Sequence, residues 1–206
     1  MRKVFISYHH ANDQWYKNQI GKWAGEYDLF EDISVDTGDI DDDDRTSERI
    51  RQIIRDDFLV DSEVTLVLIG SETSGRKHVD WEIKSSMIDG KISKKSGIVI
   101  VMLPDSGGTS VRVAFDGEKE NLYPDIQSWI HIPDRQKFEQ TYPSLPQRLY
   151  DNLLKSEVKV PVTTWDRISG DPGILGALVN ASAANAPSND YDLSLPMRRR
   201  NSPSRY

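Results

Sequence analysis

Two almost continuous runs of apolar residues constrain the fold of this chain more than any other feature. EVTLVLI occupies residues 63–69, and IVIVML occupies residues 98–103. A strand that faces water on one side alternates apolar and polar residues, whereas a strand covered on both faces is apolar nearly throughout. Both runs are therefore expected to be central strands of a parallel sheet that carries helices on each face.

Shorter segments complete an alternation of strands and helices. KVFIS at residues 3–7 reads as a buried strand, LFEDISV at 29–35 as a weaker one, and WIHI at 129–132 as the last. Apolar residues recur at helical spacing in four segments: Tyr16, Ile20 and Trp23; Ile50, Ile53, Ile54 and Phe58; Val79, Ile83 and Met87; Leu145, Leu149, Leu153 and Leu154. The pattern predicts an α/β fold with a parallel sheet of about five strands and helices on both faces.

Composition divides the chain near residue 165. With 206 residues, 37% of them hydrophobic, the chain is long enough for one domain with a buried core, which we assign to residues 1–165. Residues 166–206 are mostly small and polar and end in MRRRNSPSRY, so they are expected to be a low-complexity tail, extended or disordered. Residues 104–127, rich in glycine and charge, are expected to be irregular or to form a hairpin.

Charge and cysteine content exclude several classes of function. The net charge of −7 argues against a protein that binds nucleic acid or an anionic membrane, because phosphate contacts need a basic face. The absence of cysteine excludes disulfides, thiolate catalysis and cysteine-rich zinc sites. No apolar stretch approaches the roughly 18 to 20 residues that span a bilayer, and Val4–Ile6 is too short for a signal peptide. A cytoplasmic protein is expected.

The loop GSETSGRKHVDWEI, residues 70–83, resembles a phosphate-binding loop without matching one. Gly70 and Gly75 have the spacing of a Walker A motif, but Arg76 follows where that motif needs lysine and then serine or threonine. Ser-Tyr-His-His follows the first strand, where a dinucleotide-binding fold needs G-x-G-x-x-G. The acidic residues of a phospho-receiver are also missing from the strand ends. All three nucleotide-fold readings are disfavoured.

The carboxyl edge of a parallel sheet is the expected place for a ligand. That rule nominates Ser7, Tyr8, His9 and His10 after the first strand, Asp36–Asp44 after the second, and Gly70, Ser71 and Thr73 after the third. Glu82 lies in the first turns of the following helix, beside its apolar face. Its carboxylate either overhangs the crevice or only complements the helix dipole, and spacing alone leaves both readings open.

No metal site is expected. Asp39, Asp41 and Asp43 fit the first positions of a calcium loop, but Asp44 stands where glycine is needed and Ile50 where glutamate is needed. His9 and His10 are adjacent, so on an extended segment they point to opposite faces and cannot chelate one ion. The acidic loop reads as a solvated segment that leads into a helix or contacts a neighbouring subunit.

Several motifs together resemble the TIR-like domains of bacteria and archaea, a group that includes NAD-consuming sensors of Thoeris antiphage systems. They are VFISY at residues 4–8, DSEVT at 61–65 running into VLIG at 67–70, Thr73, and RKHVDWEI at 76–83. The resemblance covers about residues 1–155, and its most specific part is FISY combined with WEI. It implies a flavodoxin-like sheet, and cytoplasmic signalling that begins with the cleavage of NAD.

The resemblance also implies roles for particular residues. Enzymatic TIR domains use a glutamate in the helix after the third strand, which corresponds by position to Glu82. The implied substrate-binding residues are Phe5, Ser7, Tyr8, His9, Ser71 and Trp81. NAD would be the substrate, with no cofactor, and family members often complete the site by self-association. The product would act on a nucleotide-sensing effector protein, after activation by a phage-derived trigger.

Other functions stay open at this point. The product of NAD cleavage could be ADP-ribose, a cyclic isomer or a conjugate, and the sequence does not select among them. A non-catalytic TIR-like scaffold that acts by self-association or partner binding is the second reading. A third is another N-glycosidic enzyme on a similar fold, such as a nucleoside deoxyribosyltransferase.

Overall fold

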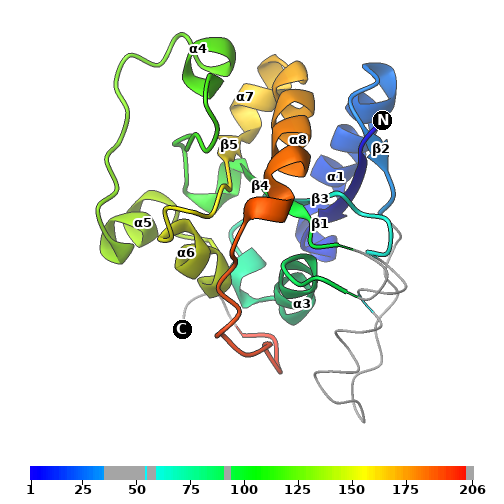
Figure 1. Cartoon of the computed structure of the whole chain (residues 1–206), viewed down its shortest axis with the longest axis vertical. Coiled ribbons are helices and arrows are strands. Elements are labelled where there is room, and N and C mark those ends of the chain that lie inside the picture. Colours follow the sequence, from blue (N-terminus) through cyan, green and yellow to red (C-terminus); the bar gives the residue numbers. More distant parts are fainter. Residues whose placement is uncertain (35–53, 55–58, 91–93, 203–206) are drawn as a thin grey trace.

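The computed structural model describes residues 1–34, 54, 59–90 and 94–202, which form a central sheet surrounded by helices (Figure 1). Five strands are ordered β2-β1-β3-β4-β5, and every neighbouring pair is parallel. The order and the direction of the strands confirm the predicted α/β, flavodoxin-like class. The predicted helix over Ile50–Phe58 and the acidic loop Asp36–Asp44 fall outside the described residues, apart from the buried Ile54.

The strands follow the apolar runs of the sequence. β1 (Lys3–Ser7), β3 (Val64–Ile69) and β4 (Gly97–Met102) form the centre of the sheet. Every residue of β3 and β4 is buried, as expected for strands covered on both faces. The weak strand predicted over 29–35 is reduced to β2 (Glu31–Asp32), at one edge, and β5 (Val162–Thr164) forms the other edge.

The helices are placed on the sheet by their apolar stripes. In chain order they are α1 (His10–Glu26), α3 (Lys77–Ser86), α4 (Glu118–Leu122), α5 (Arg135–Thr141), α6 (Gln147–Leu153), α7 (Trp165–Gly170) and α8 (Gly173–Asn185). Short 3₁₀ turns are η2 (Thr73–Gly75), η3 (Pro104–Ser106) and η4 (Ala186–Ser188). The predicted helices around residues 16–23, 79–87 and 145–154 are confirmed as α1, α3 and α6. None of the described helices combines the length and the apolar character needed to cross a membrane.

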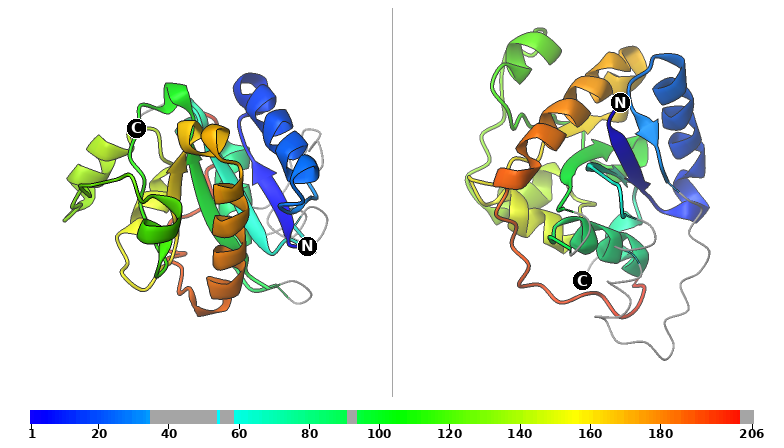
Figure 2. Two further views of the ribbon diagram at one scale, coloured as in Figure 1. Left: turned by 90° about the horizontal axis from the view of Figure 1, so that it is seen from above. Right: turned by 45° about the vertical axis from the view of Figure 1, so that its right-hand side comes forward.

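Two hydrophobic cores lie on the two faces of the sheet. Because side chains alternate along β3, Leu66 packs in one core with Ile20 of α1 and Leu175 of α8, while Ile69 packs in the other core. That second core contains Val79 of α3 and Leu149 of α6. Figure 2 shows α1 and α8 beside the sheet in two orientations. Each fully buried aliphatic side chain contributes about 1.5–3 kcal/mol through the removal of its surface from water.

The part of the chain after residue 128 differs from the prediction in two ways. Residues 129–132 are not a strand, and the last strand is instead β5. The predicted tail is wrong for α7 and α8, which are helical and contribute Ile168, Leu175 and Leu178 to the core. The predicted boundary at residue 165 therefore falls inside α7.

Small residues let α8 approach the sheet closely. A Cβ placed on Gly97, the first residue of β4, would lie 2.4 Å from the backbone oxygen of Ser182 on α8. Only glycine fits there without a backbone shift. The same small residues give α8 the composition of a low-complexity segment. The residues that allow close packing are therefore also the reason that the sequence did not predict this helix.

Residues 104–127 form mostly irregular structure, as predicted, and carry η3 and the short helix α4. Arg112 makes an isolated antiparallel bridge to Val162, with backbone hydrogen bonds of 2.8 and 2.9 Å in the two directions. This bridge covers part of the outer edge of β5, which would otherwise present unpaired backbone groups.

Candidate active site

The strand order creates a switch point between β1 and β3. These strands are neighbours in the sheet, yet the chain leaves β1 toward α1 on one face and leaves β3 toward α3 on the other. In sheets with this order, ligands bind in the crevice outside the carboxyl ends of the two strands. Ser7 ends β1 and Gly70 follows β3, so both lie at this point.

Glu82 meets Ser7 beneath the switch point. Ser7 Oγ donates a hydrogen bond of 2.6 Å to Glu82 Oε2, and both side chains are buried. Burial raises the pKa of the Glu82 carboxyl from 4.5 to about 8, while the Ser7 hydrogen bond opposes that rise. At neutral pH the buried Glu82 side chain is therefore a neutral carboxylic acid. A raised pKa in a residue near a strand-end crevice is typical of functional sites.

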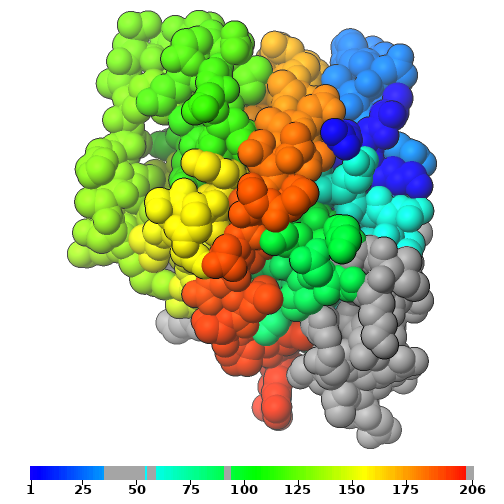
Figure 3. Space-filling model, viewed as in Figure 1, coloured from blue at the N-terminus to red at the C-terminus, as the bar shows by residue number. Residues whose placement is uncertain are grey.

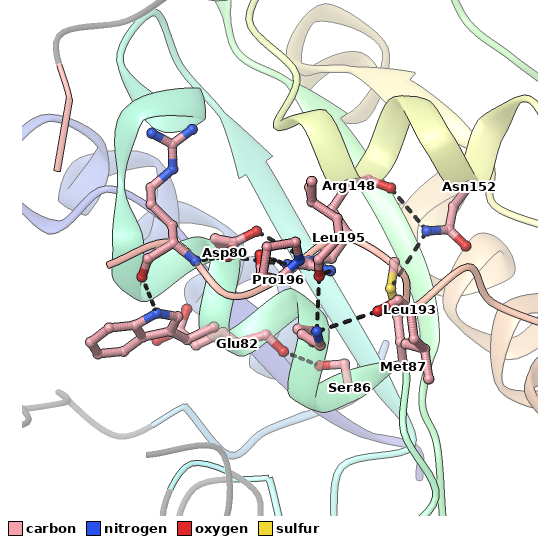
Figure 4. A network of polar contacts seen from close by, with 12 residues as sticks. Asp80, Glu82, Ser86, Met87, Arg148, Asn152, Leu193, Leu195 and Pro196 are labelled. Carbon is pink, nitrogen blue, oxygen red and sulfur yellow. Dashed lines mark hydrogen bonds and ion pairs between the residues drawn. The ribbon is translucent and has the colours of Figure 1, made fainter. Parts of the chain in front are cut away.

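A chain of buried hydroxyl groups fixes the helix turn that carries Glu82. Ser86 Oγ donates to the Glu82 backbone oxygen at 2.8 Å, and the Thr65 and Ser86 hydroxyls are 2.6 Å apart. Thr65 is the second residue of β3, so this contact ties α3 directly to the sheet. Figure 4 shows Glu82 and Ser86 on the same side of α3. Because these polar groups are satisfied inside the core, they define one rotation of the helix against the strands.

Phe5 and Trp81 lie on the same face of the sheet as Glu82. Both are 2% exposed and belong to one buried cluster with Ile54, Leu59 and Met197. The alternation of side chains along β1 explains why Phe5 and Ser7 share the face that α3 covers. The structure thus brings four of the seven predicted site residues together, namely Phe5, Ser7, Trp81 and Glu82.

Tyr8, His9 and Ser71 lie elsewhere. Tyr8 packs in the core on the α1 face, stacks on His10 with ring centroids 4.4 Å apart, and donates to Gln14 Oε1 at 2.7 Å. His9 precedes α1 and is partly buried, which lowers its pKa. Ser71 donates from its backbone nitrogen and its hydroxyl to Asp105 Oδ2, at 3.2 and 2.7 Å. These residues lie along the carboxyl edge of the sheet and do not belong to the group formed by Phe5, Ser7, Trp81 and Glu82.

The sequence reading missed Asp13, a buried carboxyl group at the same edge. Asp13 is 2% exposed and faces Gly70, where an added Cβ would lie 2.8 Å from Asp13 Oδ1. Burial, and secondarily the charge of Asp105, raises the pKa of Asp13 to about 6. The available signal was its spacing, because Asp13, Tyr16 and Ile20 lie at i, i+3 and i+7 on one face of α1.

Two further observations bound the site. Among the described residues, no group of three or more His, Asp or Glu side chains could hold a metal ion.

A cavity of about 630 Å³ lies between η2 and the helices α5 and α6, lined by residues such as Ser74, Gln140 and Gln147. None of the predicted site residues lines it, so cavity size and the buried carboxyl group point to different places. The candidate site is the switch point, because Glu82 supplies a buried carboxyl group there.

The buried acid at position 82 has a measurable effect on stability. In the unfolded chain the carboxyl ionises near its ordinary value of 4.5, whereas in the folded protein it keeps its proton up to about pH 8. The free energy of unfolding is therefore highest below pH 4.5, as far as Glu82 contributes to it, and decreases as the pH rises toward 8. Glu82→Gln removes this penalty, so its stability advantage over the wild type should grow by about 1.4 kcal/mol per pH unit across that window.

Urea unfolding at pH 5 and pH 8 measures this effect directly. Glu26→Gln is a matched control, because Glu26 is an exposed residue at the end of α1. We expect the control to follow the wild type at both pH values. A Glu82→Gln advantage that is equal at pH 5 and pH 8 would show that Glu82 ionises normally in the folded protein.

A family model described as Thoeris protein ThsB, TIR-like domain, matches residues 5–107. The chain belongs to this family. The match confirms the resemblance read from FISY and WEI, and it runs from β1 to the loop after η3, including Phe5, Ser7 and Glu82. It ends before β5, α7 and α8. No match was found among curated proteins.

Proposed function

We propose that this TIR-like domain cleaves the bond between nicotinamide and ribose in NAD and acts in antiphage defence. The observation that carries the proposal is the buried pair of Ser7 and Glu82, which places a carboxyl group at the switch point of a flavodoxin-like sheet. Its helix is the one that bears the glutamate of enzymatic TIR domains. Membership of the ThsB family supports the same assignment.

The reaction needs one well-placed negative charge. The bond from C1′ to the nicotinamide nitrogen breaks, and its electron pair leaves with nicotinamide, which departs as a neutral molecule and needs no general acid. The ribose becomes oxocarbenium-like, and the Glu82 carboxylate stabilises that developing cation more than the ground state. Water then adds to C1′ and passes its proton to Glu82, which releases it to solvent. The sum is NAD and water giving nicotinamide, ADP-ribose and one proton.

The surrounding residues supply the remaining functions of a dinucleotide site. Phe5 and Trp81 provide apolar surface beside Glu82, and Ser7 holds its carboxyl group in place. Tyr8, His9 and Ser71 line the carboxyl edge, where the rest of the dinucleotide would extend. NAD serves as substrate, and no cofactor enters the chemistry.

The biological context is part of the same proposal. A cytoplasmic enzyme of this kind would be activated by a phage-derived trigger and would make a nucleotide that a sensing effector protein detects. Self-association is proposed through the acidic loop Asp36–Asp44. A cyclic isomer or a conjugate would arise if a hydroxyl group of the substrate or another acceptor replaced water at C1′.

Nicotinamide release from NAD by the purified protein, followed against pH, tests the proposal. The reaction needs the carboxylate, and the free enzyme holds the Glu82 proton up to about pH 8. We therefore expect kcat/KM to rise with pH and to level off above about 8, because this parameter reports the pKa of the free enzyme. Nucleoside turnover without NAD turnover would favour the deoxyribosyltransferase reading. A rate that falls between pH 6 and 8 would contradict the role given to the carboxylate.

A further inference from the structure

The chain beyond η4 is an extended segment that lies against the helix carrying Glu82. Residues 189–202, which we call the strap, contain no helix or strand. In Figure 1 the strap descends from η4 beside α6 and reaches α3. Figure 3 shows the orange-red end of the chain seated between the yellow and green parts of the surface. The strap lies outside residues 5–107, which the family model matches.

Basic side chains hold the middle of the strap by its backbone. Arg148 of α6 donates to the carbonyl oxygens of Leu195 and Pro196, at 2.9 and 3.1 Å. Lys84 of α3 donates to the Leu195 carbonyl at 2.8 Å. Figure 4 shows these carbonyl groups directed at α3 and α6. Contacts of this kind bind the strap through its main chain, with little burial of its side chains.

The far end of the strap binds the first turn of α3. The Arg198 backbone nitrogen donates to Asp80 Oδ2 at 2.8 Å, and Trp81 Nε1 donates to the Arg198 carbonyl at 2.7 Å. The Arg198 guanidinium reaches the Ser74 carbonyl at 3.0 Å, and Asn201 Oδ1 accepts from the Lys77 backbone nitrogen at 3.0 Å. Asp80 and Trp81 immediately precede Glu82, so the strap binds α3 next to the Glu82 carboxyl group.

One apolar side chain of the strap enters the candidate site itself. Met197 is 8% exposed and belongs to the buried cluster that contains Phe5 and Trp81. These are two of the residues that form the apolar wall beside Glu82. The strap therefore fills surface that a dinucleotide would need, and in this state Glu82 is only 5% exposed.

We propose that residues 189–202 are an autoinhibitory strap, in which Met197 occupies the apolar wall of the site and must withdraw before a dinucleotide reaches Glu82. The inference rests on the proposed function. Local release around Met197 is feasible because Met197 is the only buried hydrophobic side chain of residues 192–202, and segments with few buried apolar contacts can open without unfolding of the rest. The enzyme would stay inactive until a trigger or its substrate displaced the strap.

Two full-length variants test the strap. Met197→Ser removes the apolar anchor, and its control is Leu193→Ser, an exposed strap residue. Arg198→Ala removes the contacts to Ser74 and Ser202, and its control is the exposed Arg199→Ala. We expect at least a tenfold gain in nicotinamide release for Met197→Ser and a smaller gain for Arg198→Ala, with both controls at the wild-type rate. Arg198 is only partly buried and lies outside the hydrophobic clusters, so that variant remains informative if Met197→Ser fails to fold.

Binding and proteolysis separate a failure of the strap from a failure of NAD cleavage. ADP-ribose affinity, measured by calorimetry in the Glu82→Gln background, should increase at least tenfold with Met197→Ser. Trypsin should cut at Arg198, Arg199 and Arg200 faster in Met197→Ser than in Leu193→Ser. Tighter ADP-ribose binding without nicotinamide release would support the strap and refute the cleavage reaction. Faster trypsin cutting with unchanged ADP-ribose affinity and unchanged nicotinamide release would contradict the autoinhibitory role of the strap.

Discussion

Replacing Glu82 with glutamine is expected to slow nicotinamide release by about 10²–10³-fold, the range seen when one transition-state-stabilising group is removed. Glutamine has nearly the same size and still accepts the hydrogen bond that Ser7 Oγ donates at 2.6 Å. It cannot carry the negative charge that stabilises the ribose cation. The loss should therefore appear in kcat, with little change in the affinity for NAD.

The controls distinguish the chemical role from a structural one. Because burial of Glu82 opposes folding at neutral pH, the variant should be at least as stable as the wild type, and a lost rate cannot then be assigned to unfolding. Glu26→Gln should keep full activity. Activity retained in Glu82→Gln would remove the assignment of Glu82, and phage protection retained without NAD cleavage would favour the scaffold reading.

The centre of the fold could be predicted because its signals are local and strong. Thr65–Ile69 and Ile98–Leu103 are apolar enough to mark buried strands, and Val79, Ile83 and Met87 recur at helical spacing. Once β1 and β3 are neighbours, the position of Glu82 near Ser7 follows from the direction of the chain. Spacing alone left two readings of Glu82 open, and the resemblance to TIR-like domains selected it as the candidate catalytic residue.

The missed features depend on contacts between distant segments. The apolar residues of α8 are outnumbered by small ones, and the reason for those small residues is the close approach to Gly97, which no local pattern reveals. The strap is bound mostly through its carbonyl oxygens, and backbone groups leave no mark on the amino-acid sequence. Asp13 is directed toward Gly70, a contact that also spans the fold.

The motif Asp80-Trp81-Glu82 shows how three adjacent residues receive different roles. Glu82 turns toward Ser7 and the sheet, and Trp81 joins the cluster around Met197. Asp80 instead forms an ion pair with Arg148 on α6, with nitrogen to oxygen distances of 3.0 and 3.2 Å (Figure 4). The spacing of about 100° per residue around a helix explains this division. Only the third residue is proposed to act in the chemistry.

The ion pair between Arg148 and Asp80 leads to the largest expected loss of stability. The side chain of Arg148 is fully buried and that of Asp80 is 8% exposed. Arg148→Met keeps most of the volume but leaves a buried carboxylate without its partner and removes donors to two strap carbonyls. We expect the free energy of unfolding to fall by about 3–5 kcal/mol, because a buried charge that loses its partner is strongly destabilising.

Urea unfolding of three variants at pH 7 tests this expectation. Arg167→Met is the matched control, because Arg167 pairs with Asp125 at the surface, and such pairs contribute only about 0–1 kcal/mol. The double variant Asp80→Asn with Arg148→Met should recover part of the loss, since it removes the unpaired charge while the strap carbonyls still lack their donor. A loss in Arg148→Met no larger than that of the control would mean that the pair does not hold α3, α6 and the strap together. Partial recovery in the double variant would instead assign the recovered part to the charge of Asp80 and the remainder to the strap contacts that Arg148 makes.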